Sequence, residues 1–494
     1  MDSTIRPQAF KDRARTKIVA TVGPACDSLE MLAELVAAGA DVFRLNMAHS
    51  DLETHAAVVK RIRQISRQSG QPVAILVDLA GPKIRLGELP EGEVQCAIGD
   101  VLWFVRGEPH SASELTSTYE ALVDELAVGD PVILADGSMS MEVINKQDDR
   151  VECRVTQGGK IRSRQGINLP GVKLSAPALG EEDRRHARWA AEQEADFVSL
   201  SFVRSPEDVR ELSELLRDAG SAARVIAKIE KREALDQLEA IVETADGVMV
   251  ARGDLGVETD VARMPVEQKR IVEVCRQYQR PVIIATQMLE SMHHSPRPTR
   301  AEATDVANAV LDGGDACMLS GETAIGEYPR EAVAMMNRIA LATEQSREGD
   351  APLPTPEQSA KGLHEVTRAV VLGAGRIAHE LEAKLVVVAS HSGATALALS
   401  GQRNFIPTIG LSDSPVTRRQ MCLSWGVIPL AIDAPPDVGE LIRVAEHWGR
   451  SAGGLADGDR MVLVCGSIVA VGVHDVVVVH TVGDDSDADA MSGA

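Results

Sequence analysis

The chain has 494 residues and a formal net charge of −22, from 51 Lys and Arg against 73 Asp and Glu. Apolar residues make up 44% and charged residues 25% of it, which excludes disorder, collagen and coiled coil as descriptions of the whole chain. This acidic balance argues against nucleic acid and anionic lipid as general partners. Four Trp, three Tyr and six Phe are also too few for a platform on which bases stack.

The cysteines and the N-terminal sequence indicate in which cellular compartment the protein works. Seven cysteines are scattered along the sequence without a Cys-x-x-Cys pair, so we expect reduced thiols in a reducing compartment. Residues 1–17 lack the apolar core of a secretory signal, and no apolar run has the length of a membrane span. We therefore expect a cytoplasmic protein without a membrane partner.

Short apolar runs alternate with helical patterns in the first part of the chain. A run at 17–25 ends in Gly-Pro, a helical pattern covers 29–39, and strand-like runs follow at 41–48 and 73–80. This βαβα order predicts a parallel sheet. The rhythm returns later, with predicted strands at 196–203, 224–230, 246–253, 281–288 and 315–320 and helices such as 206–219, 266–279 and 329–344. Three early and five late strands make eight, which predicts a TIM (β/α)8 barrel.

A stretch rich in Gly, Glu, Val and turn dipeptides separates the two series. We interpret it as an inserted β-barrel lid domain after the third strand. Beyond the barrel, helices alternate with Val-rich strands, as at 385–389 and 476–480, which predicts a separate α/β domain. The predicted organisation is an α/β protein with barrel 1–87, lid 88–165, barrel 166–350, linker 351–361, C-terminal α/β domain 362–483 and acidic tail 484–494.

Polar side chains follow most of the predicted barrel strands. Because the carboxyl ends of barrel strands meet at one mouth, where active sites of this fold lie, the polar ends predict one shared site. Capping of strands and helices would explain any single member of the set, but not the repetition. The set comprises Arg44, Asn46, Asp78, Ser199, Ser201, Lys228, Glu230, Arg252, Gly253, Asp254, Thr286 and Gln287, with 320–323 after the last strand.

Two carboxylates in this set suit a metal. Lys228 and Glu230 are two residues apart, so both point to the same side of a strand. Glu230 and Asp254 lie at the ends of consecutive predicted strands, and two carboxylates completed by substrate oxygens and water form a typical Mg²⁺ site. An ordinary Lys–Glu ion pair remains the alternative.

The cations of the set suit phosphate. Arg44 and Arg85 have the forked geometry that grips phosphate, although either could be a solvated surface arginine. The glycine in 251–254 lies at a strand-to-helix turn, where backbone N–H groups can hold an anion. These residues alone predict a Mg²⁺-dependent barrel enzyme that acts on a small phosphorylated acid.

Several long motifs are specific enough to indicate a family. They are FRLNMAH (43–49), GINLPG (166–171), AKIEKREAL (227–235), MVARGDLGVE (249–258) and ATQMLESMHHSPRPTRAEATDVANAV (285–310). With them the chain resembles the pyruvate kinase family from residue 17 to about 482, more weakly in its C-terminal third. The resemblance implies transfer of the phosphoryl group of phosphoenolpyruvate to ADP, giving ATP and pyruvate in the final step of glycolysis, with Mg²⁺ or Mn²⁺ and as a homotetramer.

The resemblance also implies a role for individual residues. Lys228 matches the lysine that neutralises the phosphoryl group in flight, and Thr286 matches the residue that delivers a proton to the enolate through water. The insert would close over the site as a lid. The other implied contacts are Arg44 and Arg85 with phosphate, Glu230 and Asp254 with metal, Ser201 and the amides of Arg252, Gly253 and Asp254 with substrate, and Pro24, Arg44, Asn46, His49 and Arg85 with nucleotide.

The chain departs from the commonest family pattern around the monovalent-cation site. Ala48 stands where a serine ligand of K⁺ is usual, Leu79 replaces a threonine, and Lys83 replaces a glutamate. The chain thereby resembles the lysine-bearing branch of the family, and we expect Lys83 to substitute for K⁺, which would not be required. In the lid, Ala135 and Gln165 replace an acidic residue and a lysine, which bears on ADP affinity.

A hydroxyl-rich loop follows a strand of the C-terminal domain. Ser390, Ser392, Gly393 and Thr395 resemble the loop that holds a phosphorylated effector in regulated members of the family. A plain strand-to-helix turn with Thr395 as a cap explains the same residues, and both interpretations stay open here.

Two other functions compete with the family's reaction. One is a different Mg²⁺ barrel enzyme acting on enolpyruvate-like acids, such as an aldolase or mutase. The other is a non-catalytic relative that binds a nucleotide or metabolite. The predicted lid and separate last domain argue against the first, and the presence of Lys228, Glu230, Asp254 and Thr286 argues against the second.

Overall fold

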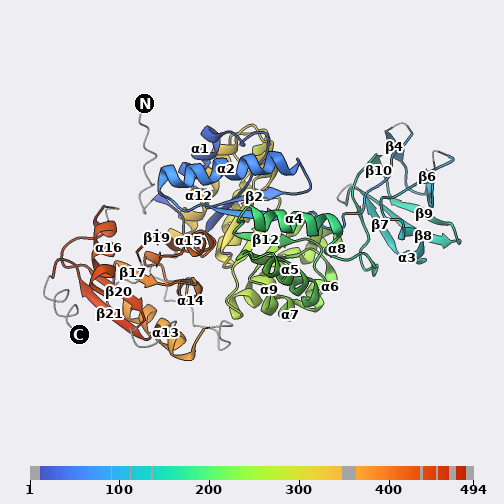
Figure 1. Cartoon of the computed structure of the whole chain (residues 1–494). Coiled ribbons are helices and arrows are strands. Elements are labelled where there is room, and N and C mark those ends of the chain that lie inside the picture. Colours follow the sequence, from blue (N-terminus) through green and yellow to red (C-terminus); the bar gives the residue numbers. More distant parts are fainter. Residues whose placement is uncertain are drawn as a thin grey trace.

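The computed structural model describes residues 12–90, 92–111, 113–134, 137–347, 363–433, 438–451, 454–466 and 474–484. Along its length lie an inserted β domain at one end, a barrel in the middle and a C-terminal α/β domain at the other end (Figure 1). The predicted linker, Ala135 and all but the first residue of the predicted tail lie outside the described residues.

Eight parallel strands close into a barrel in the order β1-β16-β15-β14-β13-β12-β3-β2. This confirms the predicted (β/α)8 fold. The strands end earlier than predicted because the polar residues after them turn into the loops of the mouth. Their bounds are β1 (Lys17–Thr21), β2 (Val42–Asn46), β3 (Ala74–Asp78), β12 (Phe197–Leu200), β13 (Arg224–Ile229), β14 (Gly247–Ala251), β15 (Val282–Ala285) and β16 (Ala316–Leu319).

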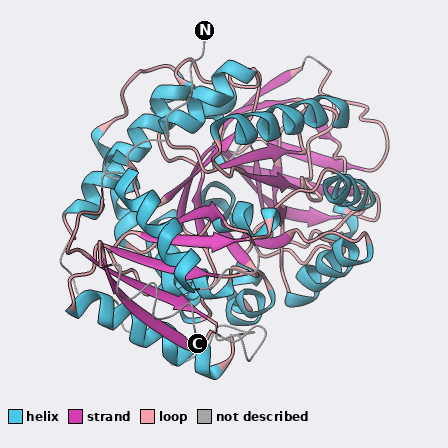
Figure 2. Ribbon diagram, turned by 60° about the vertical axis from the view of Figure 1, so that its left-hand side comes forward, coloured by secondary structure: helices cyan, strands magenta, loops and turns pink. Residues whose placement is uncertain are grey.

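Helices surround the barrel strands (Figure 2). The long ones are amphipathic and well capped: α5 begins with Pro206 and a capping box between Ser205 and Asp208, and Thr299 and Glu302 form the same motif before α10. The helices are α1 (Leu29–Ala38), α2 (Leu52–Ser69), α4 (Glu181–Glu192), α5 (Pro206–Asp218), α6 (Arg232–Asp236), α7 (Leu238–Thr244), α8 (Arg252–Glu258), α9 (Met264–Gln277), α10 (Arg300–Leu311), α11 (Gly321–Ala324) and α12 (Pro329–Gln345), with short 3-10 turns η3 (Val261–Arg263) and η4 (Glu290–His293).

A ring of four aspartates organises the amino end of the barrel. One aspartate precedes every second strand, at β2, β12, β14 and β16, and its carboxylate accepts a hydrogen bond from a backbone N–H of the neighbouring strand. These bonds bind neighbouring strands together in pairs. The pairs are Asp41 with Ile18 (2.9 Å), Asp196 with Ile75 (2.8 Å), Asp246 with Val225 (2.9 Å) and Asp315 with Val282 (2.8 Å).

The insert has a core of its own and forms two sheets. Its elements are β4 (Glu93–Cys96), β5 (Val101–Val105), β6 (Glu114–Leu115), α3 (Leu122–Glu125), β7 (Pro131–Leu134), β8 (Met139–Lys146), β9 (Arg150–Gln157), β10 (Gly159–Arg162) and β11 (Ile167–Asn168). In detail it differs from the expected β-barrel, because the hydrogen bonds of its described strands make a six-stranded and a two-stranded sheet rather than one closed ring. The chain changes sheet at Gly158, where a Cβ would lie 2.9 Å from the carbonyl oxygen of Cys96. The six-stranded sheet also includes β11, past the predicted boundary at residue 165.

The C-terminal domain is a five-stranded sheet in the order β19-β18-β17-β20-β21, antiparallel only at β21. It confirms the predicted α/β domain. Its elements are α13 (Glu365–Glu380), β17 (Leu385–Ala389), α14 (Ala394–Gly401), β18 (Thr408–Ser412), α15 (Pro415–Met421), β19 (Val427–Ala431), α16 (Val438–Ser451), β20 (Arg460–Cys465) and β21 (Val476–Thr481).

This domain packs against the amino end of the barrel, opposite the mouth. Cys422 and Leu423, which follow α15, belong to the same buried cluster as residues inside the barrel bottom. Arg419 binds the ring residue Asp196 at 2.6 Å, and Arg403 binds Asp315 at 3.0 Å. Within the described part of the chain, no helix is long and apolar enough to cross a membrane.

Candidate active site

Asp78, the last residue of β3, is the centre of the charged cluster in the barrel mouth. It is 1% exposed and accepts hydrogen bonds from Arg44 on β2 (Nε, 2.7 Å) and Ser199 on β12 (2.6 Å). The ammonium of Lys228 on β13 lies 3.4 Å from Oδ1, the Asp78 oxygen that accepts from Ser199. These strands are consecutive in the ring, so side chains distant in sequence converge at one carboxylate.

The charges of this cluster stabilise one another. Burial alone would lower the pKa of Lys228, but Asp78 and Glu230 outweigh burial and raise it, so the lysine stays cationic. Burial would raise the pKa of Asp78, but Lys228 and Arg44 outweigh it and lower that pKa. Lys228 also donates to Ser201 at 2.7 Å. The mouth therefore holds two largely buried cations that oppose negative charge on a ligand.

Glu230 follows β13, and Asp254 lies in the first turn of α8. The two Glu230 oxygens contact Lys228 (2.7 Å) and the backbone N–H of Phe202 (2.9 Å). Burial raises the pKa of Glu230, Lys228 opposes that shift, and the charge of Asp254 adds to it. A divalent cation would relieve the repulsion between these two carboxylates.

The donor set fits a metal that needs few protein ligands. Among the described residues, no group of three or more His, Cys, Asp or Glu side chains could enclose a metal ion. Mg²⁺ and Mn²⁺ accept a site of two carboxylates completed by substrate oxygens and water. Glu230 and Asp254 therefore suit such an ion.

Thr286 lies directly after β15, in a left-handed turn. Thr286 and Gln287 have φ values of 66° and 56°, and the Thr286 hydroxyl accepts a hydrogen bond of 2.9 Å from the N–H of Gly253. That bond joins the predicted proton donor to the predicted carboxylate-binding turn. It also shows that one of the three predicted substrate-binding amides already has a partner.

Four of the five predicted nucleotide residues lie on one side of the mouth, on or after β1 and β2. Pro24 is exposed in the turn after β1, and Asn46 ends β2, where its side chain accepts from the N–H of Ala48. His49 is exposed, and its carbonyl accepts from the ring of His55 on α2. Pro24 and His49 lie in the loops after β1 and β2, and Arg44 and Asn46 belong to β2 itself.

Arg85 lies apart from the charged cluster. Its guanidinium donates to the carbonyl of Arg164 (3.3 Å), its backbone N–H donates to Thr118 (2.9 Å), and it forms a bridge with Gly166. It sits on the chain that enters the insert, so its position depends on the insert. Gln165, on the returning chain, accepts from the N–H of Arg162.

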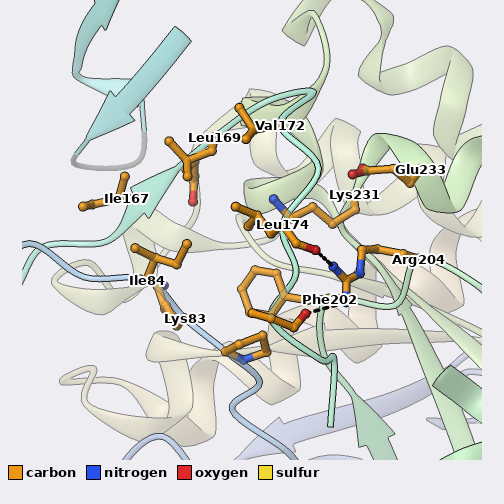
Figure 3. Close-up of a pocket in the computed structure, with 13 residues that line it drawn as sticks. Lys83, Ile84, Ile167, Leu169, Val172, Leu174, Phe202, Arg204, Lys231 and Glu233 are labelled. Carbon is orange, nitrogen blue, oxygen red and sulfur yellow. Dashed lines mark hydrogen bonds between the residues drawn. The ribbon is translucent and has the colours of Figure 1, made fainter. Parts of the chain in front are cut away.

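Lys83 lies at the hinge between barrel and insert. With Pro82 and Ile84 it lines a hollow whose other walls are the returning segment at 167–176 and the barrel residues Phe202 and Lys231 (Figure 3). Lys83 is exposed, and no carboxylate of the described residues lies within ion-pair distance of it. Lys231, by contrast, pairs with Glu258 at 2.5 Å.

The hydroxyl-rich loop of the C-terminal domain largely satisfies itself. Ser390 accepts from the N–H of Gly393, which adopts φ 79°, and Ser392 accepts from the N–H of Ala394. Thr395 contacts His474 at 3.1 Å. These internal bonds suit a capped turn, and an effector site here stays a prediction.

Two polar residues have a larger role than the sequence suggested. Asp78 and Ser199 were recognised only as polar strand ends, yet Asp78 orients both cations and Ser199 orients Asp78. The signal was present in the register, since Asp78 pairs with both Asn46 and Ser199 across its two neighbouring strands. The register between these strands is fixed by closure of the barrel, and the sequence alone does not reveal it.

A barrel mouth of this kind defines a class of enzymes that use a divalent metal to act on small phosphorylated acids. Comparisons with known proteins narrow the class. Residues 13–333 match the family model "Pyruvate kinase, barrel domain", and residues 368–480 match "Pyruvate kinase, alpha/beta domain". The chain belongs to the pyruvate kinase family, and it is therefore a phosphotransferase.

Individual relatives agree over almost the full length. Pyruvate kinase of Mycobacterium intracellulare is 40% identical over 473 residues, which cover 95% of this chain and 99% of the relative. Pyruvate kinase 2 of Synechocystis is 41% identical over 475 residues, which cover 95% of this chain and 79% of the relative. Pyruvate kinase of Bacillus licheniformis is 37% identical, with 95% and 81% covered. The family's reaction uses a divalent metal.

Proposed function

We propose that the chain transfers the phosphoryl group of phosphoenolpyruvate to ADP, giving ATP and pyruvate, at the mouth built around Asp78. The observation that carries the proposal is the convergence of Arg44 and Lys228 on this buried carboxylate, with Glu230 2.7 Å from the lysine. Two fixed cations beside a carboxylate pair are what phosphoryl transfer needs, since its catalysis is mostly positioning and charge neutralisation.

Arg44 and Lys228 would act on the phosphoryl group. Asp78 holds the Arg44 guanidinium through Nε (2.7 Å) and Nη2 (2.5 Å), and Lys228 is held by Ser201 and Glu230. Both cations are therefore positioned before substrate arrives, which avoids reorganisation during the reaction. Their charge would stabilise the oxygens of the phosphoryl group as it passes from the enolate to ADP.

Glu230 and Asp254 would hold the divalent metal, Mg²⁺ or Mn²⁺. When bound, the ion supplies positive charge to the phosphate and enolate oxygens. Glu230 keeps its orientation through the N–H of Phe202. The chain's own contribution is thus a carboxylate pair in a fixed geometry that leaves room for substrate oxygens and water.

Thr286 would deliver the proton that completes pyruvate. Its oxygen accepts from Gly253, which leaves the hydroxyl proton to be donated. After phosphoryl transfer the enolate carbon C3 takes a proton, by way of water, and the C2 oxygen becomes the ketone. The amides of Arg252 and Asp254 would hold the substrate carboxylate beside it, while the Gly253 amide stays bonded to Thr286.

ADP would bind on the rim formed by Pro24, Asn46 and His49, with Arg85 joining when the insert closes. Arg85 and Lys83 lie on the chain that leads into the insert. Closure of the insert would carry both toward the mouth and exclude water.

Lys83 would replace K⁺. It is a compact ammonium without an ion-pair partner among the described residues, and it sits on the hinge rather than in the insert core. The replacement of a serine by Ala48 and of a threonine by Leu79 removes oxygen ligands that K⁺ would need.

Two further expectations concern partners. A phosphorylated effector would bind the loop of Ser390, Ser392, Gly393 and Thr395. A homotetramer would use two self-associating faces, as tetramers with two-fold axes require. Exposed apolar residues occur in several parts of the chain, among them Val261 in η3, Val266 in α9 and Val479 on the edge strand β21.

A coupled assay of ATP formation tests the reaction and Lys228 together. Because the Lys228 charge acts mainly in the transition state, we expect Lys228→Met to lower kcat by at least ~10³-fold with a much smaller effect on phosphoenolpyruvate binding. Lys231→Met is the matched control, a buried lysine that pairs with Glu258. It should cost less than about tenfold, or about 1.4 kcal/mol in barrier. A Lys228→Met enzyme with a tenth or more of the original kcat would contradict the assignment.

A further inference from the structure

The turn after β15 is held in an unfavourable backbone conformation. Thr286 and Gln287 both lie in the left-handed region, with φ of 66° and 56°. Non-glycine residues rarely adopt such values, and a β-branched residue such as threonine does so least readily. A turn of this kind persists only where its surroundings impose it, and such turns are concentrated at functional sites.

The side chain of Arg252 supplies that constraint. Its Nε donates to the carbonyls of Ala285 (3.3 Å) and Thr286 (3.2 Å). Its Nη2 donates to the carbonyls of Thr286 (2.7 Å) and Gln287 (3.2 Å) and lies 2.8 Å from the sulfur of Met288. One guanidinium therefore bonds three successive carbonyls through two of its nitrogens and keeps the third for Asp305, a span that the single nitrogen of a lysine does not cover.

Asp305 locks this guanidinium from the opposite side. Its carboxylate lies 2.8 Å from Nη1 of Arg252, and it projects from α10. Arg252 is 9% exposed, and each of its guanidinium nitrogens has a partner. Its side chain is thus committed to the turn, not to a phosphate or carboxylate of the substrate.

We propose that Arg252, locked by Asp305, is a positioning residue for Thr286. It holds the left-handed turn so that the threonine hydroxyl faces the N–H of Gly253 and the carbon to be protonated. Without the fork, the turn relaxes toward ordinary backbone angles and the hydroxyl moves away. This inference rests on the proposed function of Thr286, and it is separate from the role of the Arg252 backbone amide.

The experiment isolates proton transfer from phosphoryl transfer. Pyruvate is incubated with the intact enzyme, Mg²⁺ and ATP in deuterium oxide, and exchange at C3 is followed by nuclear magnetic resonance. In each exchange a C3 proton is removed to give the enolate and a deuteron is returned to the same carbon. The variants are Arg252→Lys, Asp305→Asn, Thr286→Val and the double variant Arg252→Lys with Thr286→Val.

We expect Arg252→Lys to slow exchange by between about tenfold and about a hundredfold, the cost of a small misplacement of a reacting group. The KM for phosphoenolpyruvate should stay within about threefold, because the side chain does not touch substrate. Asp305→Asn should shift exchange in the same direction by less. In the Thr286→Val background, Arg252→Lys should cause no further loss. If Arg252→Lys fails to fold, the test uses Asp305→Asn instead, both by itself and combined with Thr286→Val.

The control is Lys269→Met, which removes another ion pair that reaches the end of α10, at Asp312. It should leave exchange unchanged. Loss of exchange in this control equal to that in Asp305→Asn would assign the effect to helix stability and overturn the inference. Provided that Thr286→Val alone exchanges slowly, two other results would also overturn the inference. One is exchange at the full rate in Arg252→Lys, and the other is a double variant in which the two losses add. Normal exchange in Thr286→Val would instead overturn the proposed role of Thr286 and the inference with it.

Discussion

Four charged groups of the mouth depend on one another at the residue scale. Asp78 is ionised because Lys228 and Arg44 flank it, and Lys228 remains protonated because Asp78 and Glu230 outweigh the cost of its burial. Removing one member would leave an uncompensated charge in a site with little access to water. The arrangement is therefore rigid before substrate binds, which suits a reaction whose main demand is fixed charge.

The proposed metal ligands, Glu230 and Asp254, can be tested by Mg²⁺ titration. Glu230 and Asp254 repel each other, and a divalent ion relieves the repulsion. We expect Asp254→Asn and Glu230→Gln each to raise the Mg²⁺ concentration for half activity by at least about tenfold, since even the loss of a partner behind a ligand costs that much. Glu258→Gln, which alters a buried carboxylate paired with Lys231, is the control and should leave this concentration nearly unchanged. Unaltered metal dependence in both test variants would refute the site.

Lys83 gives a prediction about monovalent cations. Its ammonium has no ion-pair partner among the described residues and should supply the charge that the family resemblance assigns to K⁺. We therefore expect full activity in buffer without K⁺ or Na⁺, with Mg²⁺ still required. Lys83→Glu should disable the K⁺-free enzyme, and added K⁺ should partly restore it. If K⁺ stimulates the unmutated enzyme by more than about tenfold, or about 1.4 kcal/mol in barrier, Lys83 does not replace the cation.

At the scale of elements, the loops after neighbouring strands act as pairs. The turn after β15 is held by Arg252, the first residue of the helix after β14. The turn after β3 is held by Ser201, just beyond β12, which donates to the carbonyl of Leu79 at 2.7 Å. Each of these two mouth loops thus has its geometry set by the adjacent βα unit, so a substitution in that unit should act on the loop beside it.

Two neighbouring helices, α2 and α4, carry buried histidines that should make stability pH-dependent. Burial lowers the pKa of both His55 and His186 below the ordinary value of 6.5. The unfolded chain then binds more protons than the folded one as the pH falls through that value, so the free energy of unfolding should decrease on acidification. It should be fully restored above about pH 7.5, where both rings are neutral in either state.

Urea unfolding at a series of pH values checks this prediction. The double variant His55→Gln with His186→Gln cannot gain these protons, and the glutamine amide introduced by the first substitution can still donate to the carbonyl of His49. The unfolding midpoint of this variant should fall less steeply between about pH 7.5 and about pH 5.5 than that of the unmutated chain. Equal slopes for the two proteins would mean that carboxylates alone cause the acid sensitivity.

For the whole molecule, the C-terminal domain closes the amino end of the barrel. Cys422 and Leu423 are each 2% exposed and pack among Phe197, Ile226 and Met249 of the barrel interior. Around them the arginines of the C-terminal domain neutralise aspartates of the ring. The two parts therefore share both a core and its charge compensation, and we expect them to unfold together.

Leu423→Ala should uncouple them. Removing a buried leucine side chain costs roughly 2–5 kcal/mol, and here the loss falls on the contact between the two parts. We expect scanning calorimetry to resolve the single main transition into two. Leu463→Ala is the matched control, since Leu463 is 1% exposed within the C-terminal sheet. It should lower the transition temperature of that domain while the barrel contact stays intact; the same pattern in both variants would contradict the shared-core account.

Much of the architecture was predictable from local sequence patterns. Eight apolar runs separated by amphipathic helices predict the barrel, because the period of a strand or helix is a local property. Polar residues after those runs predict the mouth, because all parallel strands in a barrel end on the same side. A spacing of two residues was enough to pair Lys228 with Glu230, and the structure places them 2.7 Å apart.

The tertiary structure decided what depends on strand neighbours. Asp78 is the centre of the site only because β3 lies between β2 and β12 in the barrel. The whole insert separates β3 from β12 in the sequence, but the two strands are neighbours in the structure. The aspartate ring has a sequence signal, Ala-Asp or Gly-Asp before four strands, but its meaning is a bond to the adjacent strand. Arg85 is positioned by a contact with the chain that returns from the insert, not by the barrel. Arg252 bonds the carbonyl of Thr286, which lies 34 residues later in the sequence. Sequence periodicity determines which side chains a strand presents, whereas closure of the barrel determines which side chains then meet.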